Sequence, residues 1–449
     1  MIPPPRFSLT EADKDALIVE MHGMIERMGA RIAELEALVG RPRKTSKNSG
    51  VPPSQDRFGR AKTPKRPAKK RPPRPGKCRP LAANPDRTER RTASACGHCG
   101  TDVSGAAQKL RHSYDHVDLP PIRPTVTRVE IFGGRCACCG KRYRAEAPAA
   151  MAPGTPFGPG VRSLLMYLHH SHHVGFERLS RMMGELFGLT ISEGAIANAL
   201  RRTGGAMDAA RAAIRDKLVT ARIIASDETT TRIDGVTHWQ WVFVSDRAVL
   251  HQIAPRRARS VADAVLAGHK PDVWVSDRYA GQQELGKAHQ VCLAHVLRDV
   301  QYAIDCGDTI FAPKIRDLLR WAIKVGRRRS RLKDGTLAAY AAKADRGLDA
   351  LVAMPVAHPA GKVLLKQVKA WRTKFFVFMT DRDVPATNNV SEREIRPSVV
   401  FRKVTNGFRS DWGAQIHAGY RSVTGTARLK GTTAFAAIRD LVDGNFAVA

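Results

Sequence analysis

Three acidic residues in unusual settings indicate the chemistry of this chain. Asp227 lies in the run RIIASDETTTRI, Asp277 in DVWVSDRYAGQ and Glu392 in TNNVSEREIRP. The first two end or interrupt apolar runs of β type, and the third follows a helix-start signal with Asn388 or Asn389 as the N-cap. Two strand carboxylates and one helix carboxylate form a ligand set that holds a pair of Mg²⁺ ions for phosphoryl transfer. We therefore predict a catalytic site that binds two Mg²⁺ ions.

Other acids lie close to this triad in the sequence, and each triad acid alone could be an ordinary surface residue. Glu228 neighbours Asp227, but side chains alternate along a strand, so we expect Glu228 on the opposite face. We expect Glu394 to point elsewhere on its helix, and Asp272, at the start of its strand, to be solvated. The joint occurrence of the triad in an apolar β setting favours the catalytic interpretation.

The elements around the first two acids have β periodicity. Within residues 220–304, the runs RIIASDETTTRI, HWQWVFVSD and AVLHQIAP predict three strands, with Asp234-Gly235 at the first turn. A helix (ARSVADAVLAG), a strand (DVWVSD), a helical stretch and a fifth strand (QVCLAHV) follow. Three antiparallel strands, a helix and a parallel strand make up the core of the RNase H fold. The predicted fold class is α/β, with an RNase H-like mixed sheet as the catalytic core.

The second and third acids are 115 residues apart, against 50 for the first and second. Residues 305–384 between them have a helical, charged pattern, so we predict an inserted helical module. Residues 385–449 then complete the core and add a C-terminal helix.

Two matched Cys-x-x-Cys-Gly motifs in residues 92–150 predict a zinc-ribbon-like domain. The predicted ligands of one structural Zn²⁺ are Cys96, Cys99, Cys136 and Cys139. The trailing glycines allow the turns to adopt positive φ. Cys138 could replace a neighbouring ligand, and Cys78 looks unpaired. The intervening run TVTRVEIFGGR predicts a strand.

Residues 155–215 have the pattern of a helix-turn-helix, with three predicted helices and Ser192 as the N-cap of the third. Arg201 and Arg202 end that helix and could contact DNA phosphates. A plain helical connector is the alternative. A metal site is not expected at the four histidines nearby, because neighbouring helical residues point in different directions: His169, His170, His172 and His173.

Residues 1–40 contain a helix with an apolar seam at alternating steps of three and four, which favours a short coiled coil. The seam residues are Ile18, Met21, Ile25, Met28, Ile32, Leu35 and Val39. Thr10 and Asp13 resemble an N-terminal cap. The alternative is an amphipathic helix that folds back onto its own core.

The chain is strongly basic, with a formal net charge of +32 over 449 residues, which implies a polyanionic partner such as DNA. Residues 41–91 hold 18 Lys or Arg against three acids, with clustered prolines. We predict a disordered basic linker that cannot pack, and that either binds DNA non-specifically or is a solvated spacer. No secretory signal or membrane span is visible, and eight cysteines are too few for a disulfide framework, so we expect a cytoplasmic, nucleoid-associated protein.

The motifs together resemble those of the bacterial transposases of the insertion sequence 66 family, which are DDE enzymes with an RNase H-like core. The resemblance spans almost the whole chain. It rests on KTSKNSGVPPSQD, the two cysteine motifs, SDETTTRIDG with HWQWVFVS, VSDRYAGQ, CLAHVLRDV, NNVSEREIRPSVVFRK and GYRSVTGTARLKG.

This resemblance implies that Asp227, Asp277 and Glu392 are the metal-binding catalytic triad. It also singles out Cys292 and His295, a Cys-x-x-His pair. His295 could orient near the scissile phosphate or a flipped base, or be a buried, hydrogen-bonded histidine. The basic residues that follow the third acid are expected to clamp phosphates, with an i,i+4 pair to Glu392 as the alternative for the second of them: Arg393, Arg396, Arg402 and Lys403.

The predicted function is a DNA transposase that cleaves at the ends of its element and transfers the 3′-hydroxyl to target DNA. Its partners would be the terminal repeats, target DNA, a second copy of the chain in a homodimer or larger assembly, and accessory proteins encoded by the same element. Two alternatives are a non-catalytic DNA-binding protein or decayed transposase, and an RNase H-like nuclease without strand transfer.

Overall fold

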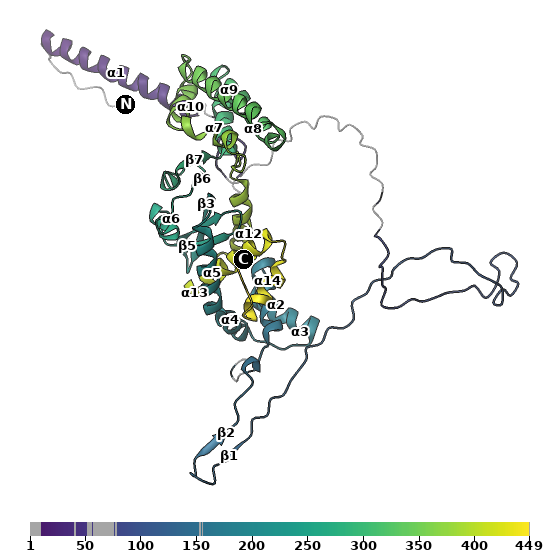
Figure 1. Cartoon of the computed structure of the whole chain (residues 1–449). Helices are drawn as coiled ribbons and strands as arrows, with labels where there is room; N and C mark the ends of the chain where they lie inside the picture. Colours follow the sequence, from purple (N-terminus) through teal and green to yellow (C-terminus); the bar gives the residue numbers. More distant parts are fainter. Residues whose placement is uncertain are drawn as a thin grey trace, which may run out of the picture. The chain divides into compact units, whose positions relative to one another are not determined.

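The computed structural model describes residues 10–39, 42–51, 56, 76, 79–151, 154 and 156–448. The chain forms two compact units (Figure 1). One comprises Met1–Arg57, Arg128–Arg181 and Ile191–Ala449, and the other comprises Phe58–Thr127 and Met182–Thr190.

A five-stranded mixed sheet lies at the centre of the first unit, in the order β5-β4-β3-β6-β7 (Figure 1). Its strands are β3 (Ile223–Ile233), β4 (Val236–Val244), β5 (Val249–Ala254), β6 (Val273–Ser276) and β7 (Ala288–Val291). β3, β4 and β5 pair antiparallel, whereas β6 is parallel to both β3 and β7. Asp234 and Gly235 both adopt positive φ in the β3–β4 turn, as a tight hairpin requires. The α/β prediction and the order of these elements are confirmed.

Helix α13 (Asp411–Leu429) covers the β5 edge of the sheet. Its Thr426 and Ser422 hydroxyls accept hydrogen bonds from the backbone N–H groups of Val249 and His251, at 3.0 and 2.8 Å. A Cβ on Gly425 would come within 2.8 Å of the Val249 side chain, so this glycine permits the close approach. The small residues of GYRSVTGTARL thus allow the helix to satisfy backbone groups of the edge strand.

Helices connect and follow the later strands. They are α6 (Arg259–Leu266), the short η3 (Ala280–Gln282), α7 (Leu293–Asp305), α12 (Asn389–Thr405) and α14 (Ala434–Val442). The three-residue η3 lies in the predicted helical stretch before β7. The predicted fifth strand QVCLAHV is wrong in its second half, because β7 ends at Val291, Cys292 is the N-cap of α7, and Leu293 begins that helix. A short apolar run fits a buried helical turn as well as a strand.

The predicted insertion is helical and gathers beyond β7 (Figure 1). Its elements are α8 (Phe311–Gly326), η4 (Arg329–Arg331), α9 (Asp334–Ala353), α10 (Pro359–Ala370), η5 (Arg372–Lys374) and α11 (Val377–Thr380). Buried Leu319 and Phe378 of the insertion belong to the same apolar cluster as Val275 and Val291 of the sheet. The insertion therefore shares a core with the sheet, which fixes the strands that carry the acids.

Between the second cysteine motif and the sheet the chain forms the helices α2 (Pro159–His172), α3 (Phe176–Phe187), α4 (Glu193–Arg201) and α5 (Gly204–Leu218). The first three match the predicted helices, and the Ser192 hydroxyl accepts a hydrogen bond from the Ala195 N–H at 3.2 Å, as an N-cap does. Helix α5 was not predicted as a separate element. Its buried residues recur at helical spacing and could have revealed it: Met207, Ala210, Ile214 and Leu218.

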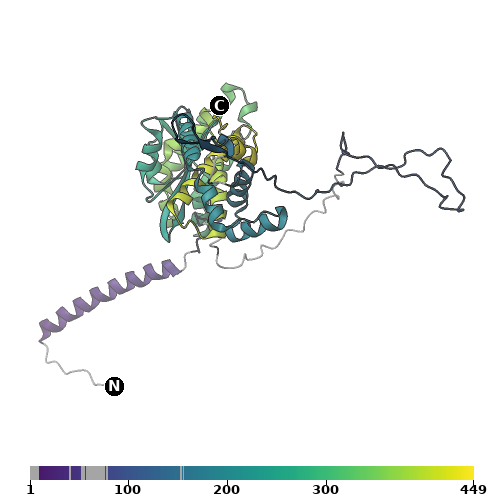
Figure 2. The same cartoon turned by 90° about the horizontal axis from the view of Figure 1, so that it is seen from below.

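Helix α1 (Glu11–Val39) is one uninterrupted helix (Figure 2). The predicted cap is confirmed, because Thr10 donates its N–H to the Asp13 carboxylate and Asp13 donates its N–H to the Thr10 hydroxyl. The described seam residues are 53–63% exposed: Ile18, Met21, Ile25, Met28 and Ile32.

Part of the predicted linker packs against the sheet-containing unit, which corrects the prediction that residues 41–91 cannot pack. Asn48 and Ser49 are buried. The Asn48 amide donates to the Asp305 carboxylate at 2.9 Å, and Lys44 lies over the Tyr302 ring. Hydrogen bonds compensate for the low apolar content of this turn. Most of residues 52–78, including Cys78, lies outside the described residues.

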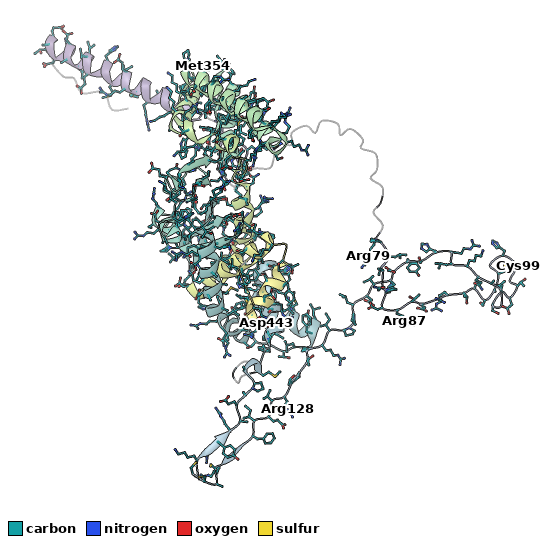
Figure 3. The ribbon with its side chains drawn as sticks, in the orientation of Figure 1. Arg79, Arg87, Cys99, Arg128, Met354 and Asp443 are labelled. Carbon is teal, nitrogen blue, oxygen red and sulfur yellow. The ribbon has the colours of Figure 1, made fainter. Side chains whose placement is uncertain are left out.

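The two cysteine motifs fold into the same local turn, each in its own unit. The Gly100 N–H donates to the Cys96 carbonyl, and the Gly140 N–H donates to the Cys136 carbonyl, both at 2.9 Å and both with positive φ. Cys99 lies at the end of an extended excursion that leads out from Arg79 (Figure 3). The strand predicted in TVTRVEIFGGR is limited to β1 (Gly133–Arg135), which pairs with β2 (Arg142–Arg144).

Candidate active site

The register of two parallel strands brings Asp227 and Asp277 to the same level of the sheet. Ala225 of β3 is paired with Val275 of β6, and each aspartate lies two residues further along. Burial raises the pKa of Asp227 well above its usual value, and the nearby charges of Glu228, Asp277 and Glu392 raise it further. The three predicted acids therefore share one electrostatic environment.

Asn388 places the third acid. It occupies the N-cap position of α12, as predicted, but its side chain does not cap the helix. Its amide donates to the Ser226 carbonyl at 2.7 Å, and its N–H donates to the Cys292 sulfur at 3.1 Å. Glu392 lies one turn into the helix, with its N–H donated to the Asn388 carbonyl at 3.2 Å. Glu392 is thus anchored to the residue before Asp227, a role that the sequence did not reveal.

The neighbouring acids all have cationic partners, in contrast to the triad. Glu228 forms an ion pair with Arg257, Glu394 with Arg428, and Asp272 with Lys287. In the part of the chain that the structure describes, no Lys or Arg forms an ion pair with Asp227, Asp277 or Glu392. Three carboxylates without cations in so basic a chain suit a bound divalent cation, because carboxylate oxygens are the ligands that Mg²⁺ prefers.

Glu228 organises the wall beside Asp277. Its carboxylate accepts hydrogen bonds from Arg257 Nε at 2.7 Å and from the Gln282 amide. The Arg257 guanidinium lies 3.8 Å from the Tyr279 ring centre, and the Tyr279 N–H donates to Asp277 Oδ1 at 2.8 Å. This network, which sequence reasoning missed, holds Asp277 through the residue two positions after it.

Cys292 and His295 lie next to Glu392. The Nδ1 atom of His295 is 3.7 Å from Oε1 of Glu392, and both atoms are buried without a hydrogen-bond partner among the described residues. Burial and the charge of Arg298 lower the pKa of His295 to about 4, so its imidazole is neutral at pH 7. Burial raises the pKa of the Cys292 thiol and of the Glu392 carboxyl, and Arg298 and Arg396 partly offset the latter.

The predicted DNA-binding residues differ in whether their side chains are exposed or already hydrogen-bonded to other parts of the chain. Arg393, Arg396 and Lys403 are exposed along α12. Arg396 acts on Glu392 through its charge, without an ion pair between them. Arg402 instead donates hydrogen bonds to the Thr229 hydroxyl at 3.0 Å and to the Thr230 hydroxyl. Its guanidinium is therefore already hydrogen-bonded to strand β3.

Arg201 and Arg202 lie apart from this helix, at the end of α4. Both are exposed, and the Arg201 guanidinium lies over the Trp412 ring, 5.8 Å from its centre. Within the described residues, the group whose atoms could hold a metal is Cys292, His295 and Glu392.

None of the helices described here combines the length and apolar character that crossing a bilayer requires.

No curated protein matches the chain. A family model described as "Transposase IS66 family" matches residues 154–416, which is more than half of the chain and includes the three acids together with Cys292 and His295. The chain therefore belongs to the transposase IS66 family.

Proposed function

We propose that this protein is a DNA transposase with an RNase H-like core, in which Asp227, Asp277 and Glu392 carry the catalysis. It cleaves a strand at each end of its element and transfers the freed 3′-hydroxyl to target DNA. The observation that carries this proposal is the contrast between these three acids, which lack Lys or Arg partners among the described residues, and the neighbouring acids, which are all paired.

The three acids would hold two Mg²⁺ ions. When bound, such a pair neutralises the scissile phosphate and supports both the attacking and the leaving oxygen. The chain's contribution is to keep the carboxylates in place. The Tyr279 N–H fixes Asp277, and Asn388 fixes the helix that presents Glu392. Rigid donors lose little freedom when a substrate binds, which favours reaction.

The basic residues around the site would bind the DNA backbone. Arg393, Arg396 and Lys403 follow Glu392 on α12 and are exposed, so we assign them phosphate contacts. Arg402 supports this surface by bonding to β3. His295 lies beside Glu392 and would therefore be close to the scissile phosphate when DNA is bound. Arg201 and Arg202 would contact the terminal repeats from the helix-turn-helix-like segment.

The remaining modules would assemble the protein on DNA. We assign α1 to a coiled coil between two copies of the chain, and the four knuckle cysteines to one structural Zn²⁺. Metal analysis should find one zinc fewer per chain in Cys99→Ser than in the parent chain, whereas Cys138→Ser should keep it. If Cys99→Ser binds as much zinc as the parent chain, this assignment is wrong.

Cleavage of a supercoiled plasmid that carries the element ends tests the catalytic proposal. With Mg²⁺ present, Asp227→Asn should reduce cleavage by about 10³-fold or more, because a triad ligand is lost. Asp272→Asn is the matched control and should cleave normally, since Asp272 pairs with Lys287 at the surface. Wild-type cleavage by Asp227→Asn would refute the catalytic triad. Products that join element ends to target DNA distinguish a transposase from a nuclease, which makes none.

A further inference from the structure

Two helix N-termini bring a thiol, an imidazole and a carboxylate together. Cys292 is the N-cap residue of α7, His295 lies in the first turn of that helix, and Glu392 lies in the first turn of α12. The ligand atoms of the three residues are all within 4.8 Å of one another. The resemblance singles out Cys292 and His295 as a pair, but the roles that it suggests for His295 do not include binding a metal ion together with the Cys292 sulfur.

The separation of the imidazole and the carboxylate suits a shared ion better than a direct hydrogen bond. His295 Nδ1 and Glu392 Oε1 are 3.7 Å apart, beyond hydrogen-bond distance, and each is buried without a hydrogen-bond partner in the described chain. Two ligands that each lie about 2.0–2.2 Å from one metal ion can be separated by this much in a tetrahedral-like arrangement. An unpartnered buried pair is costly unless something binds between its atoms.

We propose that Cys292, His295 and Glu392 form a transition-metal site of the Zn²⁺ class, with an open fourth position. Thiolate and imidazole are softer ligands than carboxylates and select Zn²⁺-like ions over Mg²⁺. Three protein ligands with one open position is the arrangement of catalytic rather than structural zinc. The inference deepens the proposed function, because it assigns a second class of ion to the site on which that function rests.

Charged side chains of both signs surround this site, and most of them are cationic. Asp277 adds a negative charge close to His295, whereas Arg278, Arg298 and Arg396 are the cations that act on His295 or Glu392. None of these arginines forms an ion pair with Glu392 among the described residues, so its carboxylate is available to a metal. The Cys292 sulfur accepts one hydrogen bond, from the Asn388 N–H, which orients it without using all of its lone pairs.

Cobalt binding to the full chain tests the proposal without relying on DNA cleavage. Co²⁺ replaces Zn²⁺ and gives visible absorption bands, with a near-ultraviolet charge-transfer band when a thiolate is a ligand. The metal-free chain and its Cys292→Ala variant are titrated with Co²⁺, and the two spectra are subtracted. The knuckle cysteines are common to both proteins, so their absorption cancels.

The difference spectrum should contain a thiolate–cobalt band, and Cys292→Ala should bind one Co²⁺ fewer per chain. Cys306→Ala is the matched control, since Cys306 is a half-buried cysteine at the other end of the same helix. Its difference spectrum should be flat. Glu392→Gln should weaken binding at the site by about 10-fold or more, because even the loss of outer partners of a metal has that effect.

A flat difference spectrum for Cys292→Ala, in a protein that keeps its far-ultraviolet circular dichroism, would overturn the proposal and favour a water bridge between His295 and Glu392. Unchanged binding by Glu392→Gln would overturn it as well, and does not depend on altering a buried cysteine. Asp227→Asn should retain the cobalt band while it loses cleavage. The metal site and the proposed transposase function can therefore fail separately.

Discussion

The side-chain amide of Asn388 donates a hydrogen bond to the backbone carbonyl of Ser226. Ser226 immediately precedes Asp227 on the central strand, and Asn388 is the residue from which α12 starts. One hydrogen bond thus links the strand that carries the first acid to the helix that carries the third, across 162 residues of sequence. The helical insertion can vary the path between them without moving the two acids apart.

Replacing Asn388 should therefore affect both stability and activity. Asn388→Ala leaves the buried Ser226 carbonyl without its donor, which should cost about 1–3 kcal/mol of unfolding free energy. Cleavage should fall further than this loss of stability explains, because Glu392 is no longer held. Urea denaturation and a cleavage assay below the unfolding transition measure the two effects. Asn389→Ala, at the next and exposed position, should change neither; equal effects of the two variants would contradict the anchoring role.

The Glu228–Arg257 pair should behave as a structural unit rather than as part of the triad. The Glu228 side chain is 1% exposed, so Glu228→Gln leaves the Arg257 charge partly buried and should cost about 3–5 kcal/mol. Adding Arg257→Met removes that charge and should restore part of the stability. A double-mutant cycle of unfolding free energies measures the coupling. Additive effects of the two changes would show that the pair does not act together.

Much of the fold follows from local patterns in the sequence. The Asp234-Gly235 turn and the alternation of the flanking runs predict the hairpin, and a short apolar run predicts β6. Of the run predicted as the fifth strand, QVCLAHV, only Gln290 and Val291 lie in β7, because α7 begins at Leu293. The same patterns select Asp227, which interrupts the apolar part of β3, and Asp277, which directly follows the buried strand β6. Local patterns do not reveal that Ala225 pairs with Val275, which is a contact between distant parts of the chain.

Other features could not be predicted because their causes are long-range polar contacts. Asn388 looks like an ordinary helix cap until its amide is seen to bond to Ser226. Glu228 looks like a rival catalytic acid until Arg257 is seen beside it. Asn48 lies in a basic, proline-rich stretch whose composition is typical of disorder, yet a bond to Asp305 holds it in place. Amino-acid composition indicates how much apolar surface a segment can bury, but it does not reveal which hydrogen bonds the segment forms with distant residues.

The Asn48 turn provides a further test. The Asn48 amide donates a hydrogen bond to the Asp305 carboxylate at 2.9 Å. Asn48→Asp replaces this donor with a second negative charge, so the turn should detach from Asp305. Limited trypsin digestion should then cut faster after Lys44 and Lys47. Gly50→Ala is the matched control in the same segment, since an added Cβ there meets no atom within 4 Å. If digestion of Asn48→Asp is no faster than that of the control, the contact does not hold the turn.

Three fully buried histidines should make stability depend on pH. Burial lowers the pKa values of His170, His251 and His417 well below 6.5, and the charge of Arg421 adds to this. The unfolded chain therefore binds protons that the folded chain excludes. Above about pH 6.5 these histidines should not reduce the free energy of unfolding. Below that pH the free energy of unfolding should fall, by up to about 1.4 kcal/mol per pH unit for each histidine.

Urea denaturation at several pH values measures this slope. His417 bonds to Ser398 at 3.1 Å and contacts His170 at 3.3 Å, so His417→Gln retains a polar group while removing one titrating site. The slope below pH 6.5 should decrease by up to about 1.4 kcal/mol per pH unit, which is the contribution of one histidine. His22→Gln, on the exposed face of α1, is the control and should leave the slope unchanged. An unchanged slope in His417→Gln would exclude His417 as a source of the pH dependence.

The exposed seam of α1 should determine the oligomeric state. Ile18, Ile25 and Ile32 recur every seven residues and are 53–63% exposed in the single chain, which is unfavourable for side chains of this size in water. Ile25→Lys should therefore shift the protein from dimer towards monomer in sedimentation experiments, because a buried lysine cannot pack in the seam. Val19→Lys is the matched control: Val19 is 72% exposed on the same helix but lies outside the seam, so its replacement should leave the dimer intact. Equal dissociation by both variants would mean that apolar surface in general, and not the heptad seam, holds the copies together. If the unmodified chain is itself monomeric, the prediction of a coiled coil is wrong.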